Sequence, residues 1–453
     1  MKVHRYRSFV LTFLFLTSTA FSASPSSPKT KNIILLIGDG MGFNQIQLTY
    51  ELTGQKPFFT SLPTTGIVFT SSGSQWVTDS AAAISAMVTG HKVKNHSLSI
   101  SQDNQPLTTL VETFKKMKKK IGLVTTTDIT DATPAGFVAH VQSRKEHEKI
   151  AEYIINEKAD LLLGGGRKYF LPKNDGGKRE DQRNLIEEAK GKGYRYISTA
   201  SQLKALDEHL SAQKILGLFH KSDLDYMIDR EELPEAKEEP TLSEMTKLAL
   251  HSLSQEKNGF FLMIEGGRID HACHQLDAAT LAKEVVEFDK AVKMTYDFSK
   301  KNKDTLILVT ADHETAGLTP TEATHHDYFR KREVSAQYMA TEIRKNNFDE
   351  ENIKKVLKQY AEISDLHSND IRLIQNTEAE DEFQTAVAVG SLMARKGELL
   401  SISIDVIHVG NTHGHTSLPV PIFSFGPNAN LFLGTMENTE IHDKILRSSG
   451  VAF

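Results

Sequence analysis

The chain has 453 residues, a formal charge of −5 at neutral pH and one cysteine, Cys273. With a single cysteine no intrachain disulfide can form, so stability must come from the hydrophobic core or from bound ions. The mildly acidic balance argues against a nucleic-acid-binding protein. Any anionic substrate must therefore be attracted by local positive charge, such as a bound metal.

Residues 1–22 predict a cleaved secretory signal. Three basic residues precede an apolar run at 9–16, and small residues follow around position 22. Removal of Lys2, Arg5 and Arg7 would move the formal charge from −5 to −8. The apolar run is too short to span a bilayer, and residues 447–453 lack the apolar tail of a lipid-anchor signal. We therefore expect a periplasmic or secreted protein without a membrane anchor.

Apolar, strand-like runs alternate with helical patterns along the chain. Strands are expected at 33–37, 121–126, 160–163, 215–219, 260–265 and 305–310, and helices at 107–119, 146–157, 242–254 and 278–300. Continuous Val/Ile/Leu runs between helices are typical of a mainly parallel sheet with both faces covered. The sequence therefore predicts an α/β three-layer sandwich, organised as one large catalytic domain over residues 23–453.

The first strand-like run leads to Asp39, which lies among three glycines that let the backbone pass close to a bound group. Parallel sheets bind ligands at the carboxyl ends of their strands, and Asp39 is expected there. An aspartate in a Gly-rich turn also commonly forms an Asx-turn. Asp39 is thus a candidate ligand whose role depends on its neighbours.

Ser80 follows Asp79 where a polar loop gives way to the Ala-rich, helix-forming run 81–87. Amides at a helix N-terminus can receive an anion, and carboxylates that bind metal elsewhere in the chain could activate the hydroxyl. Ser80 is therefore the best candidate for a covalent nucleophile. A helix cap is the alternative role for a serine at such a place.

Two further segments carry groups that suit phosphate. Asp131-Ala-Thr-Pro begins a segment that leads to Arg144, whose planar fork matches phosphate oxygens, although an unpaired surface arginine is the common alternative. The run Gly164-Gly-Gly-Arg resembles a phosphate loop but lacks the Lys-Ser/Thr ending. We expect it to form a tight turn after a strand.

A denser cluster spans residues 265–274. Glu265 ends the fifth strand-like run, and Asp270 precedes His274 by four residues, so both side chains share one helical face and can bind one ion. Cys273 lies on nearly the same side, and because zinc favours thiolates the spacing does not exclude it as a ligand. A solvated, polar helix start is the alternative.

The last part of the chain adds more possible ligands and a different composition. Asp312 and His313 follow the sixth strand-like run, and His413 and His415 lie in a turn before a strand expected at 420–425. Residues from about 321 to 400 are rich in charge and helix formers, with few strand signals. We interpret them as a cap or crown insertion that covers or flanks the site.

Together these motifs resemble those of the alkaline phosphatase family. The matching stretches are Asp39-Gly-Met-Gly, Thr78-Asp-Ser-Ala-Ala, Asp131-Ala-Thr-Pro, Ala139-His-Val-Gln-Ser-Arg, Ile264-Glu-Gly-Gly-Arg-Ile-Asp-His, Thr310-Ala-Asp-His and Gly414-His-Thr. They occur in the family's order and cover nearly all of the mature chain. The resemblance implies a secreted enzyme that hydrolyses phosphate monoesters through a phosphoserine, releasing inorganic phosphate and an alcohol.

The resemblance also implies the roles of individual residues. Ser80 matches the nucleophile and Arg144 the phosphate clamp, while Asp131 and His271 match positions beside the phosphate and a magnesium ion. The implied ligands are Asp270, His274 and His415 for one zinc, Asp39, Asp312 and His313 for the second zinc, and Asp39, Thr133 and Glu265 for magnesium. Some members have lysine in place of His271, which leaves the identity of the third metal open. Cys273 has no ligand role in the pattern, and a homodimer is expected.

Two other functions stay open at this point. A phosphodiesterase or a phosphoglycerate-mutase-like enzyme of the same metal-dependent superfamily would use similar ligands, although Arg144 favours a monoester with free terminal oxygens. A sulfatase needs a Cys/Ser-x-Pro-x-Arg context, which Ser80 lacks. A protein that sequesters zinc on an inactive scaffold would lack a nucleophile or a ligand, and none is missing here. The alcohol portion of the substrate is not specified by these residues.

Overall fold

A ten-stranded sheet forms the centre of the molecule, with strand order β12-β2-β11-β8-β1-β7-β3-β4-β6-β5. The computed structural model describes residues 30–206, 213–230, 232–378, 381–402 and 412–451. The expected signal at 1–22 lies outside these ranges. Within the described part of the chain, no helix has the length and apolar character needed to cross a membrane.

Most neighbouring strands of this sheet are parallel. Only β11 runs antiparallel to both of its neighbours, β2 and β8. The strands are β1 (Asn32–Gly38), β2 (Thr64–Phe69), β3 (Lys120–Asp128), β4 (Leu161–Gly165), β5 (Tyr194–Ile197), β6 (Lys214–Leu218), β7 (Phe260–Gly266), β8 (Thr305–Thr310), β11 (Val420–Phe425) and β12 (Gly434–Glu437). Every residue of β1, β7 and β8 is buried, which explains why these strands are continuous apolar runs.

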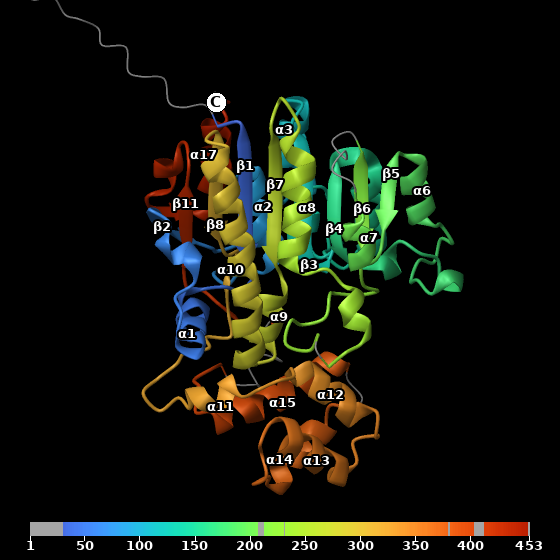
Figure 1. Cartoon of the computed structure of the whole chain (residues 1–453), viewed down its shortest axis with the longest axis vertical. Helices are drawn as coiled ribbons and strands as arrows, with labels where there is room; N and C mark the ends of the chain where they lie inside the picture. Colours follow the sequence, from blue (N-terminus) through green and yellow to red (C-terminus); the bar gives the residue numbers. More distant parts are fainter. Residues whose placement is uncertain (1–29, 207–212, 231, 379–380, 403–411, 452–453) are drawn as a thin grey trace, which may run out of the picture.

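Helices cover both faces of the sheet. In Figure 1, α8 and α10 cross in front of the strands, while α2 lies behind them. The helices of this part are α1 (Phe43–Thr53), α2 (Ser80–Thr89), α3 (Leu110–Lys116), α4 (Ala132–Gly136), α5 (His147–Tyr153), α6 (Leu185–Gly191), α7 (Ala200–Lys204), α8 (Leu242–Ser254), α9 (Arg268–His274), α10 (Ala278–Lys301) and α17 (Asn438–Ser448). This arrangement confirms the predicted α/β class and the mainly parallel sheet.

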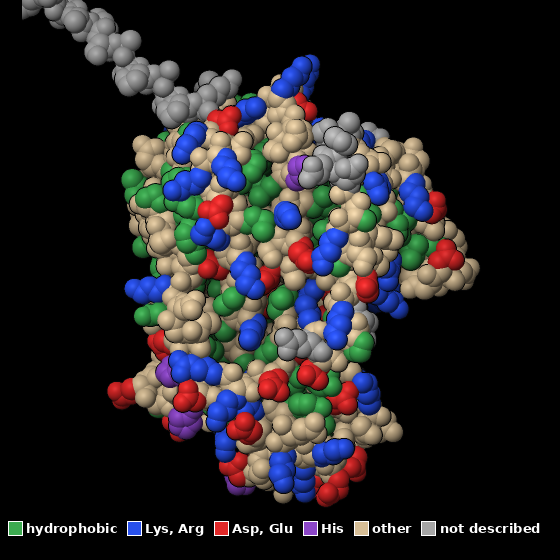
Figure 2. All heavy atoms as spheres, viewed as in Figure 1, with side chains coloured by type: hydrophobic (Ala, Val, Ile, Leu, Met, Phe, Trp, Pro, Cys, Tyr) green, Lys and Arg blue, Asp and Glu red, His purple; other side chains and the backbone are tan. Residues whose placement is uncertain are grey.

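Five helices, which we call the crown, lie beyond the end of the sheet at which β7 leads into α9 (Figure 1). They are α11 (His326–Arg330), α12 (Ala336–Arg344), α13 (Glu350–Tyr360), α14 (Ser368–Gln375) and α15 (Glu382–Lys396). Their apolar faces form a second buried cluster that includes Met339, Ile343, Leu357 and Met393. The outer surface of the crown carries acidic and basic groups side by side (Figure 2). A helical segment at 321–400 is thus what the composition predicts.

A small two-stranded sheet connects the crown end to the site. Strand β9 (Glu314–Thr315) pairs antiparallel with β10 (His415–Thr416). This pairing brings His415 beside the segment that follows β8, although about one hundred residues separate them in the chain. The carboxyl ends of β1, β7 and β8 and this small sheet therefore converge on one place.

Candidate active site

Ser80 is the first residue of α2 and is almost fully buried, with 2% of its surface exposed. The residue before it, Asp79, caps the helix because its Oδ1 accepts a hydrogen bond of 3.0 Å from the amide of Ala82. The Ser80 Oγ lies 3.2 Å from Nε2 of His313 and 3.4 Å from Nη1 of Arg144. The helix start expected from the sequence is correct, and the hydroxyl lies between an imidazole and a guanidinium.

Arg144 is held in place by two carboxylates. Its Nη2 donates to Asp131 Oδ1 at 3.0 Å, and its Nη1 lies 3.4 Å from Asp79 Oδ2. Burial opposes the charge of Arg144, but Asp131 and Asp79 more than offset this and raise the arginine pKa. Burial also acts against the Asp79 carboxylate, yet a hydrogen bond from His96 and the charge of Arg144 lower its pKa well below the ordinary value. The guanidinium is therefore always charged and faces Ser80 in a fixed orientation.

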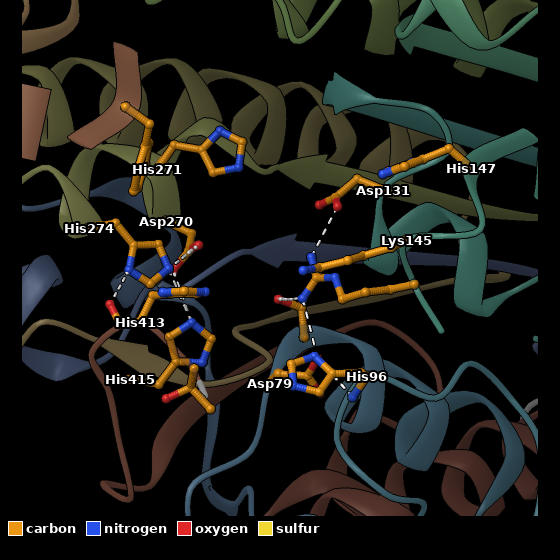
Figure 3. A pocket seen from close by; sticks show the side chains of 14 residues that line it. Asp79, His96, Asp131, Lys145, His147, Asp270, His271, His274, His413 and His415 are labelled. Atoms are coloured by element: carbon orange, nitrogen blue, oxygen red, sulfur yellow. Dashed lines mark hydrogen bonds and ion pairs between the residues drawn. The ribbon is translucent and has the colours of Figure 1, made fainter. Parts of the chain in front are cut away.

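These groups line a cavity of about 330 Å³. Figure 3 shows Asp131, Lys145 and His147 on one side of it, and Asp270, His271 and His274 on the other. The sequence reasoning missed several lining residues, which are Asp79, His96, Lys145, His147 and Phe383. Asp79 could have been predicted from its position before the helix, whereas the sequence around the other four residues has no motif that indicates a site.

Asp270, His274 and His415 form the first group of possible metal ligands. Asp270 and His274 lie on one face of α9, as predicted, and Asp270 Oδ2 is 3.0 Å from His274 Nε2. His415 Nε2 lies 3.2 Å from His274 Nε2 and 3.9 Å from Asp270 Oδ1. The ring Nδ1 atoms contact backbone carbonyl oxygens, His413 for His274 and Thr78 for His415, at 2.8 and 2.9 Å. A carbonyl only accepts, so each Nδ1 carries a proton, and in a neutral ring the Nε2 lone pair points at the group's centre.

The charges in this group call for a cation at the centre. Burial and the nearby His313 hold the pKa of His415 well below its usual range, so this ring is neutral. Burial also disfavours the charged form of His274, but Asp270 raises the pKa of that imidazole. A positive charge is thus stabilised where the three side chains meet. When the histidines are deprotonated, a bound metal ion can provide this positive charge.

Asp39, Asp312 and His313 form the second group, and all three are buried. His313 Nε2 lies 3.5 Å from Asp39 Oδ1 and 3.2 Å from Asp312 Oδ2. Thr315 donates its hydroxyl proton to Asp270, so its oxygen accepts from His313 Nδ1 at 3.1 Å. A neutral His313 therefore directs its Nε2 lone pair at two carboxylate oxygens. The same two oxygens have no hydrogen-bond donor in the described structure.

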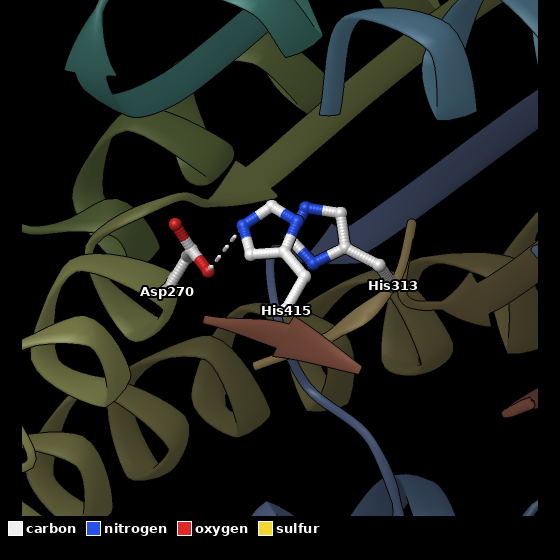
Figure 4. A group of neighbouring side chains, drawn as sticks. All are labelled: Asp270, His313 and His415. Carbon is white, nitrogen blue, oxygen red and sulfur yellow. Dashed lines mark ion pairs between the residues drawn. The ribbon is translucent and has the colours of Figure 1, made fainter. Parts of the chain in front are cut away.

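The two groups are close neighbours. The rings of His313 and His415 stack with their centroids 3.6 Å apart, beside Asp270 (Figure 4). Asp270, His313 and His415 offer atoms that all lie within 4.8 Å of one another, as do Asp39, Asp312 and His313. His313 thus belongs to both sets of neighbours, and Ser80 lies against it. The sequence-predicted ligands of the two zinc ions come together in one centre.

The remaining expected ligands, Thr133 and Glu265, lie next to Asp39. Thr133 Oγ1 is 3.4 Å from Asp39 Oδ2, and Glu265 Oε2 accepts a hydrogen bond of 2.5 Å from Thr125. Burial and then Asp312 raise the pKa of Asp39 well above its usual range. Burial, followed by Asp131 and Asp312, raises the pKa of Glu265 to about 8. Glu265 Oε1 is another buried oxygen with no donor in the described structure. These residues have the oxygen donors that a magnesium ion needs.

Two further residues of α9, His271 and Cys273, lie next to the possible metal ligands. His271 lines the cavity, and its Nδ1 lies 2.8 Å from Nη1 of Arg268, which can only donate. Burial lowers the His271 pKa, and although Asp223 acts in the opposite direction, the charge of Arg268 adds to the effect of burial. The neutral ring therefore carries its proton on Nε2. Cys273 is fully buried and belongs to none of the described ligand groups. Burial and then Asp270 raise its pKa well above the ordinary value.

A third set of possible ligand atoms lies outside the cavity. His220, Asp225 and Glu239 have one atom each within 4.8 Å of the others. Glu239 Oε2 already accepts a hydrogen bond of 2.9 Å from the amide of Asp225 and lies 3.7 Å from Arg230. Glu239 is therefore stabilised by protein groups, unlike the carboxylates beside Ser80.

The comparison with known families assigns this arrangement. The family model described as alkaline phosphatase matches residues 30–450. The chain belongs to the alkaline phosphatase family. It is 33% identical to alkaline phosphatase 3 of Bacillus subtilis over 97% of this chain and 96% of that protein. It is 31% identical to the repressible alkaline phosphatase of Saccharomyces cerevisiae over 93% and 82%, respectively.

Solved alkaline phosphatases share the fold. The Thermus thermophilus enzyme superimposes with a TM-score of 0.83 at 25% identity, covering 97% of this chain and 96% of that one. The enzyme of a psychrophilic Shewanella species gives a TM-score of 0.76 at 29% identity, covering 92% and 99%. A mutant of the enzyme from the Antarctic bacterium TAB5, solved with magnesium in its M3 site, gives 0.68 at 28% identity, covering 94% and 100%. The chain is accordingly a phosphatase enzyme of this family.

Proposed function

We propose that this alkaline phosphatase hydrolyses phosphate monoesters through a covalent phosphoserine on Ser80, with release of inorganic phosphate and an alcohol. The observation that carries the proposal is the position of the Ser80 hydroxyl, 3.2 Å from His313 and 3.4 Å from Arg144 at the start of α2. A nucleophile needs an activating group, which a zinc ion held by His313 and its neighbours would supply to the adjacent hydroxyl. An anionic substrate needs a fixed positive partner, and Arg144 is that partner.

We infer that Asp270, His274 and His415 bind one zinc ion, and that Asp39, Asp312 and His313 bind the other. Asp39, Thr133 and Glu265 would bind a magnesium ion. The convergent imidazole lone pairs and the buried carboxylate oxygens without donors support these assignments. Bound zinc would lower the pKa of a hydroxyl or water and stabilise charge on the departing oxygen.

The chain's own residues would bind and orient the phosphate. The fork of Arg144 binds two phosphate oxygens, and Asp131 and Asp79 keep it in position. The positive end of α2 faces the same anion. His271 donates its Nε2 proton to a phosphate oxygen, because Arg268 occupies its Nδ1. Ser80 Oγ would lose its proton to solvent and attack the phosphorus, and the P–O bond to the alcohol would break. The alcohol oxygen would depart on the side of Asp270, His274 and His415 and take up a proton from water. A water molecule would then attack the phosphoserine from that side, which releases inorganic phosphate and restores the Ser80 hydroxyl.

The remaining expectations belong to this proposal. A protein with a cleaved signal at 1–22 would act in the periplasm or outside the cell. Residues 23–453 would form one catalytic domain in which the crown at about 321–400 flanks the pocket. The enzyme would act as a homodimer on small monoesters, with no role for nucleic acid or a membrane anchor.

Trapping the phosphoserine tests the proposal directly. The purified protein with zinc and magnesium is mixed with phosphate-labelled monoester, quenched in acid and digested. Label is expected on the peptide that contains Ser80, and Ser80→Ala should remove both the label and turnover. A matched control is Ser201→Ala, because Ser201 is exposed on α7. Label on another residue, or full turnover in Ser80→Ala, would contradict the proposal.

A second measurement separates a monoesterase from a diesterase. Phenyl phosphate and diphenyl phosphate carry the same leaving group, and the arginine fork needs free terminal oxygens. We expect kcat/KM for the monoester to exceed that for the diester by several orders of magnitude. A preference for the diester would overturn the proposed substrate class.

A further inference from the structure

A second cavity of about 210 Å³ adjoins the catalytic cavity, and the two share His271 and Phe383 as lining residues. His271 comes from α9 of the core, whereas Phe383 comes from α15 of the crown. The second cavity therefore lies at the junction of core and crown. Apart from His271 and the Arg268 that orients it, its lining residues have no part in the binding of phosphate described above.

The second cavity opens on the side from which the alcohol would depart. The Phe383 ring packs edge-on against His274, with a centroid distance of 6.2 Å. In Figure 3, His271 and His274 lie together on the side opposite to Asp131 and Lys145. His274 belongs to the group that faces the departing oxygen in the proposed function. The alcohol portion of a bound monoester would thus extend past Phe383 toward the second cavity.

A hydrogen-bonded chain fixes the wall of this cavity. Arg268 Nη2 donates to Gln337 Oε1 at 2.9 Å, and Gln337 Nε2 lies 3.4 Å from Glu382 Oε1. Gln337 lies on α12 and Glu382 on α15, so the chain ties α9 to two crown helices. The guanidinium of Arg268 also lies 3.6 Å from the ring centroid of Tyr226. The cavity is therefore formed before any ligand binds.

The charge of the cavity is negative. Its lining contains one guanidinium, Arg268, and three carboxylates, Asp223, Asp225 and Glu382. Asp223 lies 3.7 Å from Arg268, which offsets its charge. Asp225 and Glu382 have no lysine or arginine within ion-pair distance among the described residues. Two carboxylates beside the aromatic ring of Phe383 favour an organic cation.

We propose that this cavity is a subsite for the alcohol portion of the substrate and that it selects monoesters whose alcohol carries an ammonium group. The inference rests on the proposed function, since it places the phosphate at Ser80. It adds a preference that the phosphate-binding residues cannot supply, because they contact only the group shared by all monoesters.

The test compares three series of alkyl phosphates of matched chain length, ending in an ammonium group, a neutral hydroxyl or a carboxylate. At pH 8 a primary amine remains protonated. We expect kcat/KM to be about three- to fivefold higher for the ammonium ester than for the neutral one, and lowest for the carboxylate. The readout is the ratio of kcat/KM for the ammonium ester to kcat/KM for the neutral ester. Comparing this ratio between variants cancels differences in the reactivity of the leaving groups.

Charge-removing variants identify the cavity. Glu382→Gln and Asp225→Asn keep the shape of the side chain, and each should reduce the ammonium preference about two- to fourfold. The control is Glu351→Gln, which removes one negative charge from an exposed position on α13 of the same crown. It should keep the ratio of the unmodified enzyme. Thermal melting of each variant shows that it is folded, and Glu382→Gln suffices if Asp225→Asn does not fold.

Three outcomes would overturn the proposal, and they differ in meaning. Equal ratios in the unmodified enzyme and the variants, with all esters hydrolysed, would refute the subsite and leave the phosphatase function intact. No hydrolysis of any monoester would refute both. Calcium bound by the unmodified enzyme but not by Asp225→Asn, with no ammonium preference in the unmodified enzyme, would assign Asp225 to a metal site with His220 and Glu239 instead.

Discussion

The molecule has two sets of buried carboxylates, one at the junction of core and crown and one at the active site, and their hydrogen-bond partners differ. Asp229 and Asp277 connect the core to the crown at the start of α12. Asp229 accepts hydrogen bonds of 2.7 and 2.6 Å from the amide and hydroxyl of Ser335. Asp277 accepts from the amide and hydroxyl of Thr280 and from the amide of Ala336. Both oxygens of each carboxylate are therefore satisfied by protein groups.

The carboxylates at the ends of β1, β7 and β8 are equally buried but incompletely satisfied. Asp39, Glu265 and Asp312 each keep one oxygen without a donor in the described structure. Burial raises the pKa in both sets, to about 7 for Asp229 and about 8 for Glu265. Burial alone therefore does not mark a functional carboxylate. The missing donors do, since a buried oxygen without a partner is costly unless a cation binds it.

The strongest test of this difference replaces one carboxylate of each set. Asp39→Asn should lower kcat/KM by about 10²- to 10³-fold, the cost of losing one preorganised electrostatic partner, and should lower the bound zinc. Asp277→Asn should keep zinc and kcat but destabilise the fold by about 1–3 kcal/mol, because the amide matches the donors of Thr280 and Ala336 poorly. Metal analysis, kinetics and urea unfolding check both. Loss of zinc in both variants would remove the distinction.

Replacing Arg144 should lower kcat/KM less than replacing Asp39, because Arg144 is not one of the proposed metal ligands. Arg144→Ala should lower kcat/KM by about 10- to 100-fold, as expected for a charge-assisted, bidentate contact, and should weaken inhibition by inorganic phosphate in parallel. Zinc content should stay unchanged. Arg183→Ala is the control, because Arg183 is partly exposed and pairs with Glu152 and Glu188. Phosphate inhibition of normal strength in Arg144→Ala would exclude the clamp.

The pH dependence of stability separates the two sets through their need for metal. The pKa of Glu265 is about 8 in the folded protein against an ordinary value of 4.5. Between these two pH values the folded state binds a proton that the unfolded state has lost. The contribution of Glu265 to stability is therefore fully present below about pH 4.5 and is lost as the pH rises through 8. The melting temperature of the metal-free protein should fall by several degrees between pH 5 and 8. Bound zinc and magnesium should remove the part of this fall that Glu265 causes, and Glu265→Gln should remove the same part without metal, while the contribution of Asp229 stays in every case. A flat profile in the unmodified metal-free protein would contradict the assignment.

Much of this arrangement could be predicted because it is encoded locally. Buried strands such as β1 and β8 are apolar on both faces, and ligands follow directly at their ends. Strand β2 was missed because its residues alternate between buried and exposed over a short stretch, which resembles a polar loop. Thr315 and Phe383 were missed for another reason. Thr315 acts by bonding Asp270, 45 residues away, and Phe383 enters the cavity only through the packing of the crown.

Cys273 gives the smallest expected effect and tests the ligand assignment from the opposite direction. Spacing alone leaves this thiol open as a zinc ligand, yet it is fully buried, and burial with the nearby Asp270 raises its pKa well above the ordinary value. A thiol that stays protonated is a poor metal ligand. Cys273→Ala should therefore change kcat/KM less than about twofold and cost about 1 kcal/mol of stability, the loss expected for one small buried group. Zinc content at the normal level in this variant, with strong loss in Asp270→Asn, would show that α9 binds the ion through Asp270 and His274, whereas loss of zinc in Cys273→Ala would make the thiol a ligand.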